Sequence, residues 1–405
     1  MLHPKMAHVY VGIDMHRRTH TATIINCFFE PLGEVTFRNR TPDFPELEKE
    51  VKKHLSEGVT PIYGLEDCVS MGRELTIYLK SKGHIVKYVN PSETKNERDS
   101  QASLHKTDSF DSLCIARVLL SKLSQLPDAQ ADDKLWALTE LVTKRTSLVR
   151  AGTGIKNQLH TYVSHHYPSY KQFFSLFDGK TALEFWEKYP SPERLKDVNI
   201  TDFAKFLQKE SCNGLAFDKA CDIFGLIDED SYISHEMQDI SDFIVSLSVK
   251  QLKETLALIK SLDEKIQALV PEFGYKLHTM KGINYTTAAA LIVEIGDISR
   301  FSSSARLAAY AGISPVEFSS GSSERNFSNK RGNRNLNHLI FFLAVLHTSS
   351  HGEKGGPFNV VLAEYYKKKL SEGKTKKQAI KCVMRRLINI IYQMMRDKSE
   401  YRPPA

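Results

Sequence analysis

Four carboxylates, each at the boundary of an expected strand or helix, constrain the fold of this chain most strongly. Asp14 ends the strand-like run VYVGID, Glu66 follows the strand-like run PIYGL, and Asp108 and Asp111 belong to the segment KTDSFD. The i, i+3 spacing of the last two predicts that both side chains leave one face of a helix. Acids from distant segments that meet in one place repel each other unless a cation lies among them.

Magnesium suits such a place, because this ion prefers carboxylate oxygens and keeps open positions for phosphate. Two ions about 3.5–4 Å apart can hold the attacking and leaving oxygens of a phosphodiester. We therefore expect Asp14, Glu66, Asp108 and Asp111 to bind two Mg²⁺ ions, with Mn²⁺ as a substitute, in an enzyme that acts on nucleic acid.

Composition predicts a soluble protein of several domains. A chain of 405 residues exceeds one ordinary core, and its 41% hydrophobic and 25% charged residues are typical of globular proteins. The longest apolar stretch, TTAAALIVEI, is shorter than the roughly 20 residues that cross a bilayer. The start lacks a secretory signal, and the six cysteines are scattered without a C-x-x-C pair. We expect a cytoplasmic protein of a bacterium or archaeon that does not bind membranes.

Positive charge is concentrated in the C-terminal part. Residues 325–405 contain 17 Lys and Arg against 5 Asp and Glu, a net charge of 17 − 5 = +12. The whole chain carries +7, so residues 1–324 carry 7 − 12 = −5. A basic end on a mildly acidic body indicates binding to the phosphate backbone of nucleic acid. A solvated lysine-rich helix is the alternative explanation.

Residues 1–130 are expected to form an α/β domain. Three strand candidates are followed by a helix, a strand, a helix, a strand and the helix of Asp108 and Asp111. This order, with acids on the first strand, the fourth strand and the last helix, resembles the RNase H-like fold in its RuvC-like version. Singly, Asp14 could cap a turn, Glu66 could be a surface residue and Asp108 could be a helix N-cap. We take Asp67 and Glu93 as bystanders.

Residues 131–275 are expected to be helical, with leucine-rich stretches that could pair. The first runs from Leu138 to Tyr162 and the second from Leu252 to Leu269, with apolar residues at alternating spacings of three and four. Such helices form an antiparallel coiled coil, mediate dimerisation or pack in a bundle within one subunit. The sequence leaves these alternatives open, and residues 165–235 indicate no chemistry.

Residues 276–405 are expected to form a mainly α-helical domain that binds nucleic acid. The turn Lys281-Gly282-Ile283-Asn284 before a small-residue helix is typical of helix-hairpin-helix motifs, which present backbone N–H groups to phosphate. A Ser/Gly-rich loop and the basic cluster NKRGNRN follow. The expected nucleic-acid contacts are Lys281, Gly282, Asn284, Arg325, Lys330, Arg331, Asn333 and Arg334.

These motifs together resemble the DEDD-motif insertion-sequence transposases, a group related to Piv-type DNA invertases. The matching pieces are GID at Asp14, LED at Glu66, HKTDSFD at Asp108 and Asp111, and the run from GIN through AAYAGISP, SSG and KRGN. The resemblance covers roughly residues 8–160 and 276–395. It implies a RuvC-like site for Mg²⁺ and a serine nucleophile, here Ser320, that attacks DNA and holds it as a phosphoserine.

The resemblance also implies partners. Family members act on double-stranded DNA as homodimers and homotetramers, with the acids of one subunit joined to the serine of another. Several are guided by a structured non-coding RNA, which leaves the protein to recognise shape and backbone. Lys330, Arg331 and Arg334 would then hold the phosphate backbone.

Three features of this sequence depart from the family pattern or leave alternatives. The turn usually reads P-G-I-G, and Asn337 replaces a family arginine. Ser319 competes with Ser320 as the nucleophile, whereas Ser322 and Ser323 are expected to be loop or phosphate-contact residues. The alternative functions are a junction-resolving endonuclease, whose acids activate water, and a nucleic-acid-binding protein that has lost catalysis.

Overall fold

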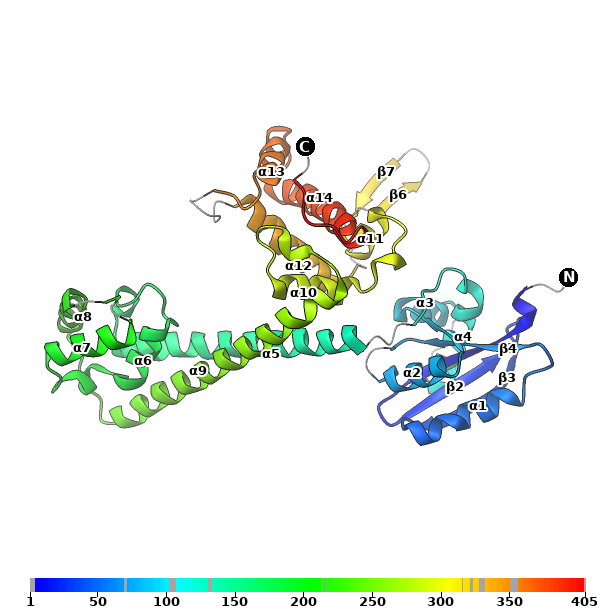
Figure 1. The fold of residues 1–405 in the computed structure, drawn as a ribbon, viewed down its shortest axis with the longest axis horizontal. Coiled ribbons are helices and arrows are strands. Elements are labelled where there is room, and N and C mark those ends of the chain that lie inside the picture. The colour runs from blue at the N-terminus through cyan, green and yellow to red at the C-terminus, as the bar shows by residue number, and fades with distance from the viewer. Residues whose placement is uncertain are drawn as a thin grey trace. The chain divides into compact units, whose positions relative to one another are not determined.

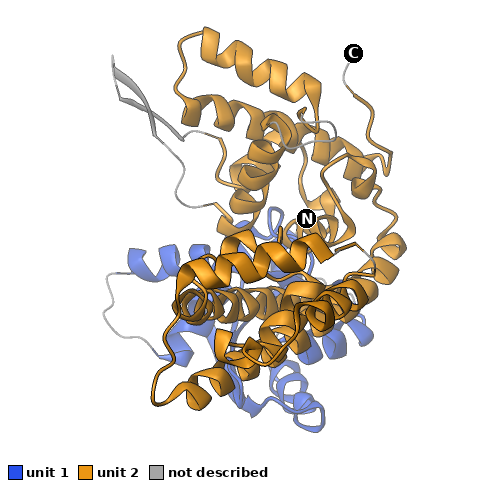
Figure 2. Cartoon of the chain, turned by 90° about the vertical axis from the view of Figure 1, so that its left-hand side faces the viewer, with its two compact units in different colours: residues 1–137 blue, residues 138–405 orange. Residues whose placement is uncertain are grey.

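The computed structural model describes residues 4–68, 71–101, 107–129, 133–212, 214–215, 217–314, 316–320, 323–327, 332–349 and 356–403. These residues belong to two compact units, residues 1–137 and residues 138–405 (Figure 2). In the described residues no helix is both long enough and apolar enough to span a bilayer. The predicted division into three domains stays a prediction.

A five-stranded sheet organises the N-terminal unit (Figure 1). The strands lie in the order β3-β2-β1-β4-β5, with β1 antiparallel to β2 and parallel to β4. This mixed sheet with helices on both faces is the RNase H-like fold that the sequence predicts. Its elements are η1 (Pro4–Ala7), β1 (His8–Met15), β2 (Thr19–Ile25), β3 (Pro31–Arg38), η2 (Thr41–Asp43), α1 (Phe44–Lys52), β4 (Thr60–Leu65), α2 (Arg73–Ser81), β5 (Ile85–Tyr88), α3 (Pro91–Ser100) and α4 (Asp108–Lys122).

Alternation along the strands divides the core between the two faces of the sheet. Val9, Val11 and Ile13 of β1 pack in one cluster with residues of α1 and α2. Tyr10 packs in the other cluster with Ile115 and neighbouring residues of α4. The side of β1 that carries Tyr10, Gly12 and Asp14 therefore faces α4.

Two glycines allow α4 to lie close to the sheet. Gly12 of β1 is paired in register with Gly64 of β4. A Cβ atom on Gly12 would lie 2.2 Å from both the backbone N of Ala116 and the backbone O of Ser112. The Ser112 hydroxyl also lies 2.6 Å from the Thr23 hydroxyl of β2. The position of α4 thus depends on the missing side chain at residue 12.

The second unit begins with two long helices that pack against each other. Its elements are the long helix α5 (Asp133–His166), which starts in the first unit, η3 (Tyr170–Gln172), α6 (Lys180–Lys188), η4 (Pro192–Leu195), α7 (Ile200–Glu210), α8 (Phe217–Asp230), α9 (Gln238–Leu269), η5 (Val270–Phe273), η6 (Leu277–Thr279), α10 (Tyr285–Ile295), η7 (Ile298–Arg300), α11 (Ser304–Tyr310), β6 (Val316–Ser320), β7 (Ser323–Phe327), α12 (Arg334–Thr348), α13 (Val360–Ser371) and α14 (Lys376–Arg396).

Helices α5 and α9 run antiparallel within one chain. Arg145 pairs with Asp263, and the His166 ring, at the other end of α5, lies 2.8 Å from the Ser241 hydroxyl near the start of α9. The N-terminal half of α5 therefore lies beside the end of α9, and the end of α5 lies beside the start of α9. Pairing within the chain is one of the alternatives that the leucine spacing predicts.

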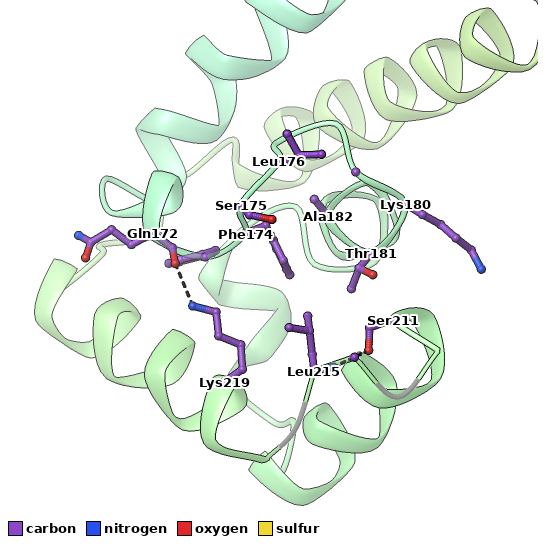
Figure 3. A pocket seen from close by; sticks show the side chains of 13 residues that line it. Gln172, Phe174, Ser175, Leu176, Lys180, Thr181, Ala182, Ser211, Leu215 and Lys219 are labelled. Carbon is purple, nitrogen blue, oxygen red and sulfur yellow. Dashed lines mark hydrogen bonds between the residues drawn. The ribbon is translucent and has the colours of Figure 1, made fainter. Parts of the chain in front are cut away.

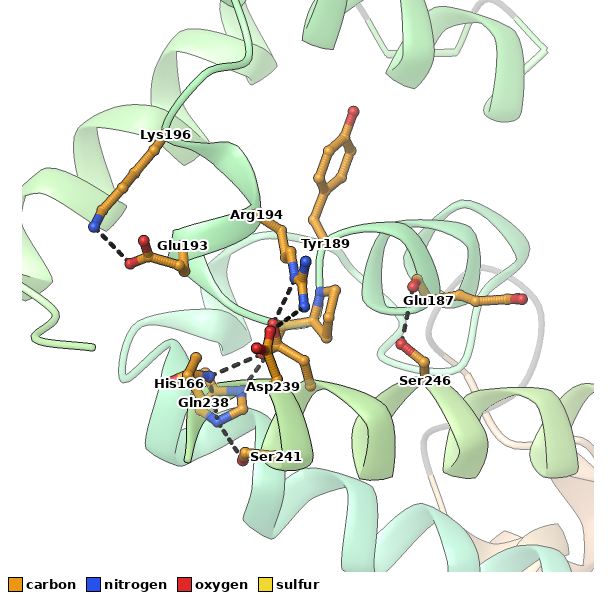
Figure 4. Close-up of polar contacts among 12 residues, drawn as sticks. His166, Glu187, Tyr189, Glu193, Arg194, Lys196, Gln238, Asp239, Ser241 and Ser246 are labelled. Carbon is orange, nitrogen blue, oxygen red and sulfur yellow. Dashed lines mark hydrogen bonds and ion pairs between the residues drawn. The ribbon is translucent and has the colours of Figure 1, made fainter. Parts of the chain in front are cut away.

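Aromatic side chains fill the core at the far end of these two helices. Trp186 is fully buried and stacks on Phe173 at a centroid distance of 5.9 Å. Nearby, the buried His166 ring lies beside Gln238, whose side chain donates to Asp242, and Arg194 binds Asp242 at 2.7 Å (Figure 4). A cavity of about 470 Å³ opens beside this core between Gln172 and Lys219, whose ammonium group donates to the Gln172 carbonyl (Figure 3). The network and the packed rings give this segment a structural role.

Helices α10 to α14 form the C-terminal part, with the antiparallel hairpin β6–β7 projecting from it (Figure 1). The hairpin is fixed at its base. A Cβ atom on Gly332 would lie 2.2 Å from the backbone N of Gly312, so the two glycines are in backbone contact. The backbone N–H of Asn333 also donates to the backbone carbonyl of Tyr310 at 2.6 Å. Gly332 and Asn333, the described part of the KRGN run, therefore contact Gly312 and Tyr310 of the AYAG run.

Gly12→Ala is expected to destabilise the N-terminal unit by about 2–3 kcal/mol, because the added methyl group meets backbone atoms that cannot rotate away. Hydrogen exchange of α4 amides in the full chain measures the opening free energy. Gly64→Ala is the matched control, since its Cβ would meet the flexible ends of Leu119 and Val89 at 3.1 Å. Equal losses for the two variants would contradict this account of the α4 contact.

Candidate active site

Asp14 and Glu66 extend from adjacent strands on the side of the sheet that α4 covers. Ile13 of β1 pairs with Leu65 of β4 in a parallel register, so the next residues, Asp14 and Glu66, lie at the same level. The period-2 alternation places Asp14 with Gly12, and Glu66 with Gly64. Both glycines lie under α4, and both acids follow on that side.

Helix α4 brings the other two acids to this edge. The Thr107 hydroxyl accepts the N–H of Phe110, which makes Thr107 the N-cap and places Asp108 and Asp111 in the first turn. The N-cap alternative for Asp108 is thereby excluded. The Asp111 side chain is 12% exposed, whereas that of Asp108 is 60% exposed. One acid of the pair is thus buried and the other faces solvent.

A histidine links two of the acids. The Nε2 atom of His16 lies 3.0 Å from Asp14 Oδ2 and 3.2 Å from Asp108 Oδ1. One donor atom from each of these three residues lies within 4.8 Å of the others, a spacing that can hold a metal ion. His16 follows the last residue of β1, and the sequence prediction did not include it. The signal was available, because side chains at i and i+2 of a strand share a face.

Arginine also enters the site. Arg98 of α3 lies with its Nε 2.8 Å from Asp111 Oδ1. The sequence alone indicates nothing for Arg98, since only the packing of α3 beside α4 brings it there. Asp111 is therefore balanced by a cation of the protein itself.

Burial and mutual repulsion raise the pKa values of two of the acids. Burial raises the pKa of Asp14, His16 opposes the rise, and the charges of Asp111 and Asp108 add to it. Burial also raises the pKa of Glu66; Thr94 opposes this effect and the charge of Asp14 reinforces it. The charges of these acids influence one another, as the predicted cluster requires.

The arrangement fits a divalent cation. Asp14 Oδ2 and Asp111 Oδ1 are buried without a hydrogen bond, although each lies within ion-pair distance of a basic group. Buried carboxylate oxygens without hydrogen bonds are costly unless another positive partner binds them. Hard cations take oxygen ligands of this kind, and His16 adds one nitrogen. Among the described residues, donor atoms of Asp14, His16 and Asp108 lie within 4.8 Å of one another, whereas Glu66 and Asp111 fall outside the group.

The acids set aside in the sequence analysis lie in other contacts. The Asp67 carboxylate accepts the backbone N–H of Met71 at 2.8 Å. Glu93 lies 3.2 Å from the ammonium group of Lys122. Both contacts are typical of structural residues, and they make Asp67 a suitable control for substitutions in the cluster.

The predicted nucleic-acid residues of the second unit that the structure describes lie in the turn before α10, at helix starts and on the hairpin. Asn284 caps α10 by accepting the N–H of Thr287 at 2.8 Å. Gly282 has φ of 88°, and a Cβ atom there would lie 3.0 Å from His347 Cε1, so the turn requires glycine. Lys281 precedes this turn.

Ser320 ends β6 and pairs with Ser323 of β7, while Arg325 pairs with Phe318. Lys330 and Arg331 lie outside the described residues. Arg334 is exposed in the first turn of α12.

Asn333 has an internal role that the sequence did not indicate. Its amide nitrogen donates to Glu294 at 2.8 Å and to the Tyr310 hydroxyl at 3.1 Å, and its oxygen caps α12 through the N–H of Leu336. Asn337, at the position of the expected arginine, donates to the Ala311 carbonyl at 2.8 Å. Both side-chain amides therefore join the start of α12 to residues 310 and 311, which precede the hairpin β6–β7 that carries Ser320, here called the serine hairpin.

Two family models match the parts that carry these features. One for the DEDD transposases of IS110, described as "Transposase", matches residues 11–168. The other, described as "Transposase IS116/IS110/IS902 family", matches residues 274–359.

Two of the similar proteins align along nearly the whole chain and a third along two thirds of it. An uncharacterized 43.6 kDa protein of insertion element IS110 from Streptomyces coelicolor is 24% identical over 405 residues, covering 98% of this chain and 96% of that protein. The pilin gene-inverting protein of Moraxella lacunata is 24% identical over 404 residues, 98% of each chain. A transposase for insertion sequence IS1111A from Coxiella burnetii is 24% identical over 271 residues, 67% of this chain and 59% of that protein.

Asp14→Asn is expected to stabilise the metal-free protein at neutral pH and to abolish its stabilisation by metal. Because the folded-state pKa of Asp14 is raised, ionisation costs stability as pH rises through that value. The variant should therefore melt a few degrees above the wild type at pH 7.5 in EDTA, and the difference should vanish near pH 4. Adding Mn²⁺ should raise the melting temperature of the wild type only.

Asp67→Asn is the control for this experiment and should respond to Mn²⁺ as the wild type does. A melting temperature of Asp14→Asn that rises with Mn²⁺ as much as the wild-type value would contradict the metal site.

Proposed function

The chain belongs to the IS110/IS116/IS902 family of transposases, which transfer phosphoryl groups on DNA, and from this premise we propose that it moves its own element by site-specific strand exchange. The observation that carries the proposal is the meeting of Asp14, Glu66 and the first turn of α4 at one edge of the sheet. Family membership implies a divalent metal site, and this edge is where we place it.

The carboxylates of Asp14, Glu66, Asp108 and Asp111 are proposed to hold two Mg²⁺ ions, with Mn²⁺ able to replace them. When bound, such ions neutralise charge on the phosphodiester and lower the pKa of a hydroxyl beside them. His16 holds Asp14 and Asp108 in place through its Nε2 atom, and Arg98 does the same for Asp111. These two basic residues are positioning groups in this proposal.

Ser320 is proposed as the nucleophile. Its Oγ loses a proton and forms a bond to phosphorus, while one P–O bond to deoxyribose breaks and the released oxygen takes a proton. The phosphoserine conserves the phosphodiester for rejoining to a new strand. Support comes from the family resemblance and from the anchoring of the hairpin by Gly312, Gly332 and Asn333, which gives the serine a defined base.

The assembly is proposed to be a homodimer or homotetramer in which one subunit supplies the acids and another the serine. Serine and acids belong to different compact units, which agrees with a site completed between subunits. A structured guide RNA is proposed to choose the target by base pairing. The net charge of +12 in residues 325–405 supports backbone binding without base recognition by the protein.

A junction-resolving endonuclease is the second candidate, favoured by the RNase H-like sheet alone. In that enzyme the acids activate water and no protein–DNA bond forms. Covalent attachment of DNA therefore separates the two functions.

Ser320→Ala is expected to reduce covalent DNA attachment at least about 10³-fold, because no other oxygen replaces Oγ at the phosphorus. The measurement is a denaturing gel of labelled element-end DNA after incubation with Mg²⁺. Folding and DNA binding should be unchanged, since Ser320 is the last residue of the short strand β6.

Ser319→Ala is the matched control one residue away, and it should retain attachment. Attachment that survives Ser320→Ala but disappears in Ser319→Ala would assign the reaction to Ser319. Wild-type cleavage without any protein-linked DNA would favour the endonuclease.

A further inference from the structure

The final long helix, α14, is strongly basic and carries no acid. Its sequence from Lys376 to Arg396 contains six Lys and Arg and no Asp or Glu. The buried side of the helix is apolar, with Leu387 and Ile391 fully buried. Lys381 and Arg396 lie on the exposed side, and Arg385 is half-buried there. Lys381 and Arg385 lie toward the N-terminal half of the helix and Arg396 at its C-terminal end, and residues 387–395 contain no Lys or Arg.

A polar groove of about 410 Å³ adjoins the C-terminal half of this face. The groove lies between α14 and the residues that precede and begin α11. Three serine hydroxyls line one wall, and two amides and a guanidinium line the other. The polar lining residues are Ser302, Ser303, Ser304, Asn389, Gln393 and Arg396.

The walls of the groove are fixed to each other. The Tyr392 hydroxyl of α14 donates to the carbonyl of Phe301 at 3.0 Å, next to the serines. Ser303 is occupied as the N-cap of α11. Within the described residues, the side chains of Ser302, Ser304 and Asn389 have no hydrogen-bond partner, so they are available to a ligand.

The basic face leads toward the serine hairpin. Arg385, at the middle of α14, donates to the Ser314 hydroxyl at 3.2 Å. Ser314 lies two residues before β6, which ends at Ser320. In Figure 1, α14 lies beside α11, from whose end the chain continues into the hairpin. A ligand that follows α14 would therefore approach the hairpin base.

We propose that the exposed face of α14 and its polar groove form a binding track for the phosphate backbone of duplex DNA. Lys381 and Arg396 are fifteen residue steps apart, about 22 Å along the helix, and Arg385 lies between them. About six phosphates of one strand fit along that length. The cations neutralise phosphates, and the hydroxyls and amides donate hydrogen bonds to phosphate oxygens, which fix register without recognising bases.

Duplex DNA is the occupant because this family acts on DNA and because the track offers charge and hydrogen bonds without an apolar pocket. The inference rests on the proposed function only through this choice of ligand. It requires neither metal nor Ser320, so binding can be measured in EDTA, where catalysis is absent.

The test is the salt dependence of duplex DNA binding by the full chain. For each phosphate contact removed, the slope of log K against log salt concentration decreases by about 0.9. The variant K381Q/R385Q/R396Q should therefore lower the slope by roughly 2.7 relative to the wild type. The variant K196Q/K205Q/K209Q is the matched control, because it removes three exposed lysines that pair with neighbouring acids, and it should leave the slope unchanged.

Two further variants separate charge from fold. R385K/R396K combined with K381R keeps three cations and should keep the wild-type slope. S302A/S304A should lower the affinity about fivefold for each lost hydrogen bond, at every salt concentration, without changing the slope. Asp397 pairs with Arg396 at 2.8 Å, so Asp397→Asn should increase affinity.

An unchanged slope for K381Q/R385Q/R396Q in a protein that still melts like the wild type would overturn the track. Loss of binding to structured RNA with intact binding to duplex DNA would also overturn it and assign the face to RNA. A wild-type chain that binds no duplex DNA at low salt would instead refute the proposed function itself.

Discussion

Contact between α4 and the glycines of two adjacent strands positions every acid of the candidate site. Gly12 and Gly64 are paired in register, and the backbone of α4 occupies the space that a side chain at residue 12 would need. The helix can therefore begin directly beside the strand ends that carry Asp14 and Glu66. Binding chemistry at this edge thus depends on the packing of backbone against backbone a few residues away.

The closeness of these acids to one another lowers the folding stability of the metal-free protein. Buried acids that raise one another's pKa values lower folding stability at neutral pH. His16 and Arg98 offset part of this cost through ion pairs with Asp14 and Asp111. A divalent cation offsets more, because it binds several oxygens at once. In the metal site that we propose, stability of the metal-free protein and metal affinity are therefore opposed, which is typical of sites selected for chemistry.

Sequence patterns predicted the parts of this site that depend on local periodicity. Strand alternation and the i, i+3 spacing predicted that Asp14, Glu66, Asp108 and Asp111 lie at one edge of the sheet, and the element order predicted the sheet itself. Metal binding by these acids stays a prediction. Arg98 and the internal contacts of Asn333 could not be predicted, because they depend on which helices and loops become neighbours in space. A motif such as KRGN looks like a phosphate-binding cluster in sequence, although its asparagine is committed to internal hydrogen bonds.

Acids and serine belong to separate compact units, and this division has a consequence for control of the reaction. Each unit holds only part of the chemistry that we propose, so neither can cleave DNA by itself. A DNA backbone bound along α14 would be delivered to the hairpin by contacts outside the catalytic groups that we propose, since Arg385 touches Ser314. Binding can then precede the assembly of the active site. In the assembly that we propose, the acids come from a second subunit, so cleavage would await formation of the oligomer.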